Sequence, residues 1–460
     1  MQRDMRHTNF ARRAAALLPA VILAAALGAC ESVLDVQNPG AVADEQLGDT
    51  LNAKLLAPTV VSDFQRVYDD MARASAWFTD ELVSGHNFVG FREWDGRIVR
   101  EERTELRDIY TTLHQARFSA DSLVSRYRAL YPTPTPLQTL DQARMRAYGG
   151  YTYVLFGEFF CSTPLREDEA AVTSPELTKL AIPRFEEAIQ LATAAKTGTG
   201  AVPAARADSI INLARLGLAR AYLQLNDKPK AIQFAAQVPA AFEFRSFYSE
   251  QKDYAENVFF ASTTGANQNM GVDVKFRNLW TIVVNAADPA RRDTIYDPRV
   301  RHTATSRTGH NGATPLFRPY SAPSFSDWKP GTGVRGDTIN FTKNTSIRFA
   351  SGLEARYILA EAGGMTAAQL LAFVNERRAV GRQPALASAT GVDLQAELRD
   401  QRRRDFFLDG HRLGDLRRYK AQQGVDEFPK GAHPDAFIGT YGTAECFVPS
   451  LDERNGNPSY

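Results

Sequence analysis

The stretch Arg402-Arg-Arg-Asp-Phe-Phe-Leu-Asp-Gly-His-Arg412-Leu-Gly-Asp415-Leu-Arg-Arg-Tyr419 decides the fold, and it is the densest charge cluster of the chain. Its acidic residues interleave with its arginines. The spacing predicts ion pairs one helical turn apart, between Arg412 and Asp415 and between Asp415 and Arg418. A basic patch for nucleic acid is the alternative interpretation. The interleaved charges favour a structural helix, which Phe406-Phe407-Leu408 would dock onto the core.

The overall composition favours the same interpretation. The 460 residues include 54 Lys or Arg and 53 Asp or Glu, which gives a net charge of +1. A general nucleic-acid binder needs a basic surplus to displace counterions, and this chain has none. Hydrophobic residues make up 44% of the chain, which is ample for a core. The composition therefore predicts a globular protein and argues against disordered, fibrous and nucleic-acid-binding classes.

The N-terminus has the pattern of a secretion signal. Basic residues (Arg3, Arg6, Arg12, Arg13) precede an apolar run of 16 residues from Ala14 to Ala29. That run is short of the roughly 20 residues that a spanning helix needs, so a signal peptide over 1–29 is the better interpretation than an anchor helix. Leu27-Gly28-Ala29-Cys30 has the small-residue pattern of a lipobox, so Cys30 is the predicted lipidation site.

Two further cysteines follow Cys30, namely Cys161 and Cys446. In an oxidising compartment they could form a disulfide, but two distant cysteines can equally be buried thiols. The sequence leaves both alternatives open.

Apolar residues recur at helical spacing through most of the chain. The periodicity predicts helices over 102–130, 138–160, 175–194, 207–225, 230–237, 352–361, 366–379 and 393–409. The pair 207–225 and 230–237, joined by Asn226-Asp227-Lys228-Pro229, resembles one tetratricopeptide unit. We expect a tether over 30–50, a helical part over 51–240, irregular ligand-side insertions with short strands over 241–346, and C-terminal helices with a tail over 347–460. Residues 31–460 are expected to form one integrated fold.

The sequence contains none of the catalytic or metal motifs that we sought. It has no His-Glu-x-x-His, no phosphate loop ending in Gly-Lys-Ser/Thr and no Gly-x-Ser-x-Gly. One literal dinucleotide fingerprint, Gly331–Gly336, has no strand before it and no helix after it, so we interpret it as a loop. We therefore expect no enzymatic activity, no cofactor and no metal, although a secreted hydrolase remains the alternative class.

Four stretches together resemble the SusD/RagB family of nutrient-binding outer-membrane lipoproteins. They are Cys30-Glu-Ser-Val-Leu-Asp-Val-Gln-Asn-Pro39, the segment 347–362, the stretch 402–419 and the segment 446–458. The third resembles the family signature "Glu-Arg-Arg-Glu-Leu-…-Glu-Gly-His-Arg-…-Asp-Leu-Arg-Arg", with Asp405 in place of the usual Glu.

The resemblance implies a fold, a location and a partner. The fold would be mainly α, with tetratricopeptide-like helix pairs supporting an irregular side of loops and short strands that binds ligand. The protein would sit on the cell-surface side of the outer membrane, anchored by its lipid, and would pass an oligosaccharide or other nutrient to a SusC-like TonB-dependent barrel transporter. A scaffold that binds only protein is the alternative function.

Aromatic residues in irregular segments are the candidate ligand contacts, because sugar rings stack their C–H faces on aromatic rings. The candidates are Phe88, Phe91, Trp94, Trp280, Tyr296, Tyr320 and Trp328. Trp94 and Trp328 lead the list, since polar and turn residues flank them. Trp77 lies in a helical pattern and is predicted to be core.

Overall fold

The computed structural model describes residues 50–459 except 167, 253–254, 264–267, 285–286, 310–311, 313, 321–340, 389 and 391–392. The chain divides into two units, Met1–Ala53 and Lys54–Tyr460. Every helix and strand below belongs to the second unit, apart from the first four residues of α2. The predicted signal peptide, Cys30 and most of the predicted tether lie outside the described residues.

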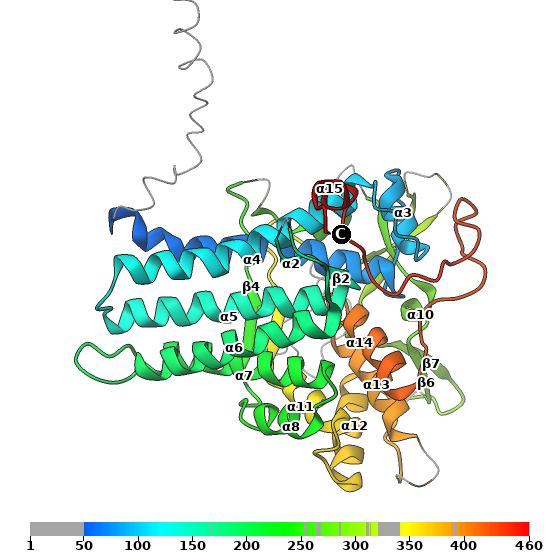
Figure 1. The fold of residues 1–460 in the computed structure, drawn as a ribbon. Helices are drawn as coiled ribbons and strands as arrows, with labels where there is room; N and C mark the ends of the chain where they lie inside the picture. Colours follow the sequence, from blue (N-terminus) through cyan, green and yellow to red (C-terminus); the bar gives the residue numbers. More distant parts are fainter. Residues whose placement is uncertain are drawn as a thin grey trace, which may run out of the picture. The chain divides into compact units, whose positions relative to one another are not determined.

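Long helices form the first half of this unit and confirm the predicted periodicity. They are α2 (Thr50–Phe78), α4 (Thr104–Leu130), α5 (Pro136–Phe159), α6 (Ser174–Ala194), α7 (Ala204–Gln224) and α8 (Lys228–Ala235). Helices α4 to α7 lie side by side in chain order (Figure 1). Local sequence fixes the helix starts: Thr135 and Gln138 form a capping box at α5, where Pro136 occupies the first turn.

Glycines allow α5, α6 and α7 to approach closely. The ring of Phe185 on α6 lies against Gly150 on α5 and Gly217 on α7. A Cβ atom would stand 2.6 Å from that ring at Gly150 and 2.3 Å from it at Gly217. The close approach therefore depends on both residues lacking a side chain.

The C-terminal part contains the three predicted helices, the last of which ends at Asp405 and not at 409, and three helical segments that were not predicted separately. In chain order, they are α11 (Gly352–Glu361), α12 (Ala367–Val380), α13 (Leu394–Asp405), α14 (Arg412–Arg418), a π-helical turn (Tyr419–Gln423) and α15 (Leu451–Gly456). Ser351 caps α11 by accepting a hydrogen bond from Glu354 N at 3.2 Å. Tyr357, Phe373 and Phe406 join these helices in one buried cluster.

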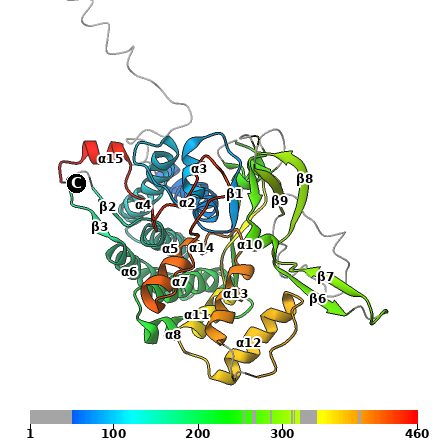
Figure 2. The same cartoon turned by 90° about the vertical axis from the view of Figure 1, so that its right-hand side faces the viewer.

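The described residues form five separate two-stranded antiparallel sheets. These pair β1 (Leu82–Ser84) with β5 (Met270–Val272), β2 (Ser162–Thr163) with β3 (Val172–Thr173), β4 (Glu243–Ser246) with β10 (Ile347–Ser351), β6 (Trp280–Val284) with β7 (Arg292–Tyr296), and β8 (His302–Thr308) with β9 (Pro315–Pro319). Figure 2 shows β6–β7 and β8–β9 on one side of the helices. The fold is mainly α, as predicted.

Three short helices interrupt the irregular segments: α3 (Val89–Asp95), α9 (Val258–Thr263) and α10 (Val274–Arg277). The segment around Phe88, Phe91 and Trp94, which was expected to be irregular, therefore contains a helix, and the irregular region expected over 241–346 contains two more. Each helix is only four to seven residues long. Such short helices lack the repeated turns from which a helical periodicity can be recognised.

The charged stretch 402–419 is structural, and most of its arginines are buried. Arg402 binds Asp415 through two hydrogen bonds of 2.7 and 3.0 Å. The predicted pair of Asp415 with Arg418 is confirmed at 2.9 Å. The predicted pair of Arg412 with Asp415 is wrong. Arg412 instead binds Asp80, just beyond α2, at 2.8 and 2.9 Å, because Asp415 is already held by the other two arginines.

The same stretch connects distant helices. Arg417 donates to the carbonyls of Gly157 and Glu158 at 3.0 and 2.7 Å, which satisfies the C-terminal end of α5. Arg418 binds the α11 residue Glu361 at 2.7 and 2.9 Å. Phe406, Phe407 and Leu408 are buried, as predicted. The stretch therefore joins α2, α5 and α11 around one set of ion pairs.

Asp405 is the most enclosed carboxylate of this network. Its oxygens accept hydrogen bonds from Arg377 at 2.8 Å each and from Arg299 at 3.1 Å, and Tyr357 also donates to it. Burial alone would raise the pKa of Asp405. The two guanidinium groups outweigh burial and hold that pKa far below its usual value.

His411 makes stability depend on pH. Burial alone would lower its pKa, but the carboxylates of Asp409 (2.7 Å) and Glu354 (3.3 Å) outweigh burial and raise the pKa to about 9. Because this value exceeds the unfolded value of about 6.5, the charged imidazole stabilises the fold fully below pH 6.5. That stability is lost as the pH rises through about 9.

We therefore expect the urea midpoint of unfolding to fall between pH 6.5 and 9.5, and to fall less in His411→Gln. The comparison with the variant separates His411 from other titrating groups. Equal slopes in the two proteins would show that His411 does not carry the effect.

A disulfide joins Cys161, just after α5, to Cys446 in the C-terminal tail, 285 residues away, with 5.4 Å between the two Cα atoms. This settles the alternative that the sequence left open. The neighbouring Phe447 is fully buried, and its N–H donates to Phe159 O at 2.8 Å. The tail is thus fixed to the end of α5 by both covalent and backbone contacts.

Candidate ligand-binding surface

Two of the predicted aromatic residues form an exposed pair on the β6–β7 ribbon. Trp280 and Tyr296 stand directly opposite each other in the antiparallel register, so their side chains share one face. Their side chains are 45% and 53% exposed. Ile282 and Val284 follow on the same face of β6 at alternate positions, each 55% exposed. The β6 half of this face is therefore apolar and open to solvent.

The rings continue from this ribbon onto the β8–β9 hairpin. The ring of Tyr296 lies 5.9 Å from that of His302, and the His302 ring lies 6.3 Å from that of Phe317, between centroids. We call Trp280, Tyr296, His302 and Phe317 the aromatic row. Arg277, at the end of α10, lies over Phe317 with its Cζ 3.8 Å from the ring centre.

His302 brings an imidazole to the row. Burial lowers the pKa of His302, and the nearby Arg277 lowers it further, so the imidazole is neutral. Trp280 and Tyr296 offer flat apolar faces, whereas Phe317 is half-buried beneath Arg277. The neutral imidazole and the guanidinium offer hydrogen-bonding groups. A surface of this kind can bind a ligand that has both apolar and polar faces.

Tyr320 and Trp328 complete the predicted set in this region. Tyr320 follows β9 and is half-buried, with the Cζ of Arg318 5.5 Å from its ring centre. Side chains alternate along a strand, so Arg318 and Tyr320 lie on the opposite face of the hairpin from Phe317. Trp328 and the glycine motif 331–336 lie outside the described residues.

Phe88, Phe91 and Trp94 form a separate group around α3. Phe88 is 57% exposed, and its ring stacks on His86 at 4.6 Å. Phe91 is half-buried. Gly85, which precedes this group, lies against Gly309, just beyond the end of β8. His302, which belongs to the aromatic row, is at the opposite end of β8, where the strand starts. The structure therefore does not bring this group to the row.

Trp94 is only 1% exposed, so the structure does not offer its ring to a ligand. Its ring packs edge-on against Phe447, with centroids 5.0 Å apart. The polar neighbours that suggested exposure belong to α3, which is covered by the tail: Arg92 binds Asp435 at 2.7 Å. Trp77 is fully buried, as predicted.

The sequence analysis did not identify Arg277, His302 and Phe317 as part of this surface. His302 and Phe317 lie on strands of one hairpin, and their juxtaposition depends on its register, in which Ala304 is opposite Phe317. Alternation in the segment 302–308 could have predicted the strand. It could not have predicted that Tyr296 would reach His302 from a different sheet.

Comparison with known proteins identifies the fold. No family model and no curated protein matches the sequence. Solved structures do match. The alignment with a SusD superfamily protein from Bacteroides vulgatus covers 90% of this chain and 98% of that protein's chain, at 13% identity and a TM-score of 0.62. A SusD-like carbohydrate binding protein from Bacteroides fragilis covers 90% and 99%, at 13% identity and a TM-score of 0.62.

The chain has the SusD fold. A third similar structure, surface glycan-binding protein A from Bacteroides uniformis, covers 88% of this chain and 98% of its own, at 14% identity and a TM-score of 0.61. The predicted resemblance to SusD proteins is thereby confirmed at the level of the fold.

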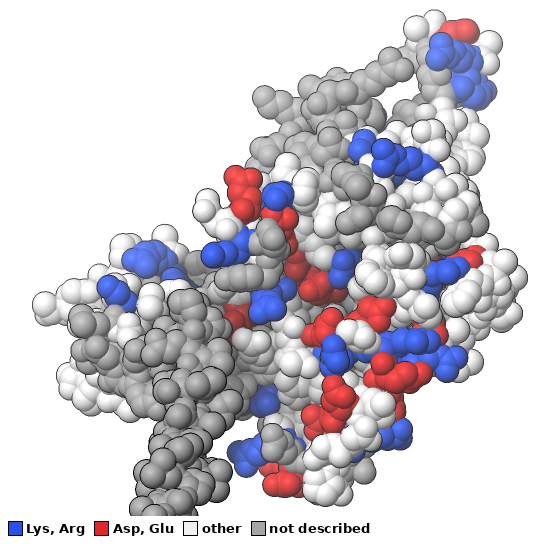
Figure 3. All heavy atoms as spheres, turned by 90° about the horizontal axis from the view of Figure 1, so that it is seen from above, with Lys and Arg blue, Asp and Glu red and all other residues white. Residues whose placement is uncertain are grey.

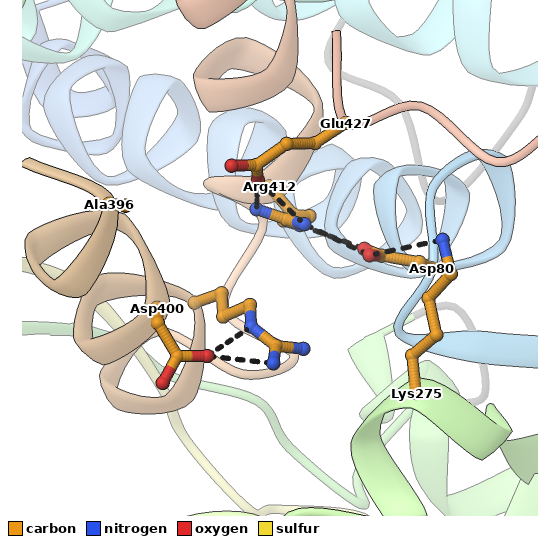
Figure 4. Close-up of a pocket in the computed structure, with 7 residues that line it drawn as sticks. Asp80, Lys275, Ala396, Asp400, Arg412 and Glu427 are labelled. Carbon is orange, nitrogen blue, oxygen red and sulfur yellow. Dashed lines mark hydrogen bonds and ion pairs between the residues drawn. The ribbon is translucent and has the colours of Figure 1, made fainter. Parts of the chain in front are cut away.

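One hollow in this SusD fold is lined mainly by charged residues. It has a volume of about 500 Å³ and is lined by Asp80, Lys275, Ala396, Asp400, Arg403, Arg412 and Glu427. Figure 4 shows Asp80 between Arg412 and Lys275. None of the described residues that line it is aromatic. Its charges are occupied with one another, since Arg412 contacts both Asp80 and Glu427.

A second hollow, of about 570 Å³, lies between α2, α5, α7 and the end of β4. Tyr148 and Phe244 line it, and Phe247 stands at 61% exposure. Arg144, Arg206 and Arg245 are also among its lining residues. This SusD fold therefore has a second aromatic surface, which lies among the long helices.

The charge distribution offers no large field of one sign on the face seen in Figure 3, where the described Lys and Arg side chains are interspersed with Asp and Glu. Among the described residues, no helix combines the length and the apolar character needed to cross a membrane. Within the same part of the chain, no three His, Cys, Asp or Glu side chains are grouped as metal ligands.

Proposed function

We propose that this protein is a cell-surface lipoprotein that binds an oligosaccharide nutrient at the aromatic row and passes it to a SusC-like TonB-dependent transporter. The observation that carries this proposal is the exposed pair Trp280 and Tyr296 on a SusD fold. Two structurally similar proteins are described as a carbohydrate binding protein and a surface glycan-binding protein, which supports a glycan ligand.

Physical chemistry supports stacking at this pair. A sugar ring presents C–H bonds on its faces and hydroxyl groups around its edge. Trp280 and Tyr296 can cover the C–H face, while the neutral His302 and the Tyr296 hydroxyl can exchange hydrogen bonds with the edge. The role is binding without chemical turnover, since the row offers no nucleophile paired with a base.

The lipid anchor is part of the proposal. The lipobox at Cys30 predicts export and lipidation, and the disulfide of Cys161 with Cys446 fits an oxidising compartment outside the cytosol. A lipoprotein carries more than one acyl chain on its cysteine, which makes membrane attachment stable. The protein would then stand at the outer membrane beside the transporter to which it delivers its ligand.

Native affinity electrophoresis tests ligand capture. The full chain, purified in detergent, is run through gels that contain a panel of plant, host and storage polysaccharides. We expect retardation in at least one gel. We expect Trp280→Ala to weaken that binding about tenfold or more, because truncating a central aromatic contact costs roughly 2 kcal/mol.

Phe247→Ala is the matched control, because Phe247 is also an exposed ring and lies at the second hollow. It should leave the retardation unchanged. Loss of binding in Phe247→Ala but not in Trp280→Ala would move the ligand to the second hollow. No retardation in any gel, together with retention of a barrel protein, would favour the alternative of a scaffold that binds only protein.

A further inference from the structure

We propose that the oligosaccharide carries an anionic group, a carboxylate or a sulfate ester, and that Arg277 binds this group at the end of the aromatic row. This inference rests on the proposed function and narrows its ligand class. A stacking surface alone does not require a charged sugar. The cations that flank the row are the reason to expect an anionic ligand.

The segment that carries the row is locally basic. Between Val274 and Tyr320 the sequence has eight Lys or Arg and three Asp or Glu, whereas the whole chain has 54 and 53. One of the three acids, Asp297, is buried and bound to Arg299 and Arg404. The surplus positive charge in this segment is therefore not balanced by its own carboxylates.

Arg277 is held in place for a ligand by stacking. Its guanidinium lies over the face of Phe317 at 3.8 Å, and among the described residues it forms no ion pair and its Nε has no hydrogen-bond acceptor. A stacked guanidinium keeps its N–H groups in the plane, directed away from the ring, so its edge can still bind an oxyanion. Arg277 is half-buried, so little side-chain freedom remains to be lost on binding.

The nearest carboxylate does not occupy this guanidinium. Burial lowers the pKa of Arg277, and Asp273 offsets only part of that effect. The Asp273 carboxylate instead accepts a hydrogen bond from Lys275 N at 2.8 Å, as the cap of α10. A ligand oxyanion would add the counter-charge that the protein does not supply.

A second cation stands at the other end of the same face. Arg292 is directly opposite Val284 in the β6–β7 register, and its Nη1 donates to the carbonyls of Pro289 and Arg291 at 2.8 and 3.3 Å. Within the described residues Arg292 forms no ion pair with a carboxylate. An acidic oligosaccharide that lies along the row would meet Arg277 at the Phe317 end, and one that extends beyond Trp280 along β6 would also meet Arg292.

Isothermal titration calorimetry on the full chain in detergent tests this proposal with charge-matched ligand pairs. Oligogalacturonate is compared with its methyl ester, and dextran sulfate with dextran. The first pair probes a carboxylate and the second a sulfate ester. We expect the acidic member of at least one pair to bind about tenfold tighter or more, the range of a hydrogen bond between charged groups.

Arg277→Gln should remove this preference, and Arg277→Lys should retain part of it. Arg318→Gln is the matched control, because it removes the same charge from the opposite face of the hairpin, where the guanidinium also lies near an aromatic ring, at 5.5 Å from Tyr320. Thermal melts of each variant confirm folding. The comparison of ligand pairs on the unmodified protein tests the proposal even where a variant does not fold.

Equal affinity for the acidic and neutral members of both pairs would overturn the proposal of an anionic ligand. In that case, loss of glycan binding in Trp280→Ala would still support the proposed function. A preference for acid that disappears in Arg318→Gln but not in Arg277→Gln would also overturn it. If no glycan of any charge binds and Trp280→Ala changes nothing, the proposed function itself fails.

Discussion

Replacing Asp405 with asparagine is expected to lower the free energy of unfolding by about 3–5 kcal/mol, the cost of removing one partner from a buried ion pair. The carboxylate is fully buried and faces Arg377, Arg299 and the hydroxyl of Tyr357. An amide can accept from one guanidinium but cannot neutralise two. The variant would leave Arg377 with only Glu376, at 3.5 Å, and would leave Arg299 to share Asp297 with Arg404.

Urea unfolding followed by circular dichroism measures this effect, with Asp400→Asn as the matched control. Asp400 lies on the same helix and also binds two arginines, Arg403 and Arg404, but its side chain is 27% exposed. We expect the control to cost about 1 kcal/mol or less. Equal losses in the two variants would show that solvent reaches Asp405 and that its enclosure is not what stabilises the fold.

Removing the disulfide is the second large effect. Replacing both Cys161 and Cys446 with serine is expected to lower the free energy of unfolding by roughly 2–5 kcal/mol, since the bridge closes a loop of 285 residues in the unfolded chain. The tail residue Phe447, whose ring packs against Trp94, would lose its covalent attachment to the end of α5. Unfolding of the tail would then expose Trp94.

Thermal melts with and without a reductant measure this effect and supply their own control. The reductant should lower the melting temperature of the unmodified protein to that of the double serine variant, and it should not change the variant. Tryptophan fluorescence at the same temperatures reports exposure of Trp94. A melting temperature that is indifferent to the reductant would show that the bridge contributes no stability.

Sequence reasoning predicted the helices well because their determinants are local. The boundaries of α11 follow from Ser351 as a cap and from the apolar spacing that begins at Gly352. The same reasoning missed α3, whose residues are held by the distant tail, for example by the contact of Arg92 with Asp435. Contacts between segments more than 300 residues apart leave no signal in local periodicity.

The sequence predicted only part of the candidate site, because some of its contacts join distant segments. Trp280 and Tyr296 are exposed aromatic residues in a segment that was expected to be irregular. Trp94 ranked ahead of both in the sequence, but Phe447 covers it. Arg277, His302 and Phe317 join the row only through the register of one hairpin and the packing of another beside it. The pairing of Arg412 with Asp80 likewise required the fold.

The five two-stranded sheets of the described chain are not hydrogen-bonded to one another. A change of register or length in one ribbon is therefore not transmitted through a hydrogen-bonded ladder to the next. The ribbon with Trp280 and Tyr296 can be lengthened, shortened or exchanged while the helices and the buried arginine network stay as they are. Ligand preference in such an architecture can diverge quickly on a conserved frame, and the ribbon is a natural position for grafting a new specificity.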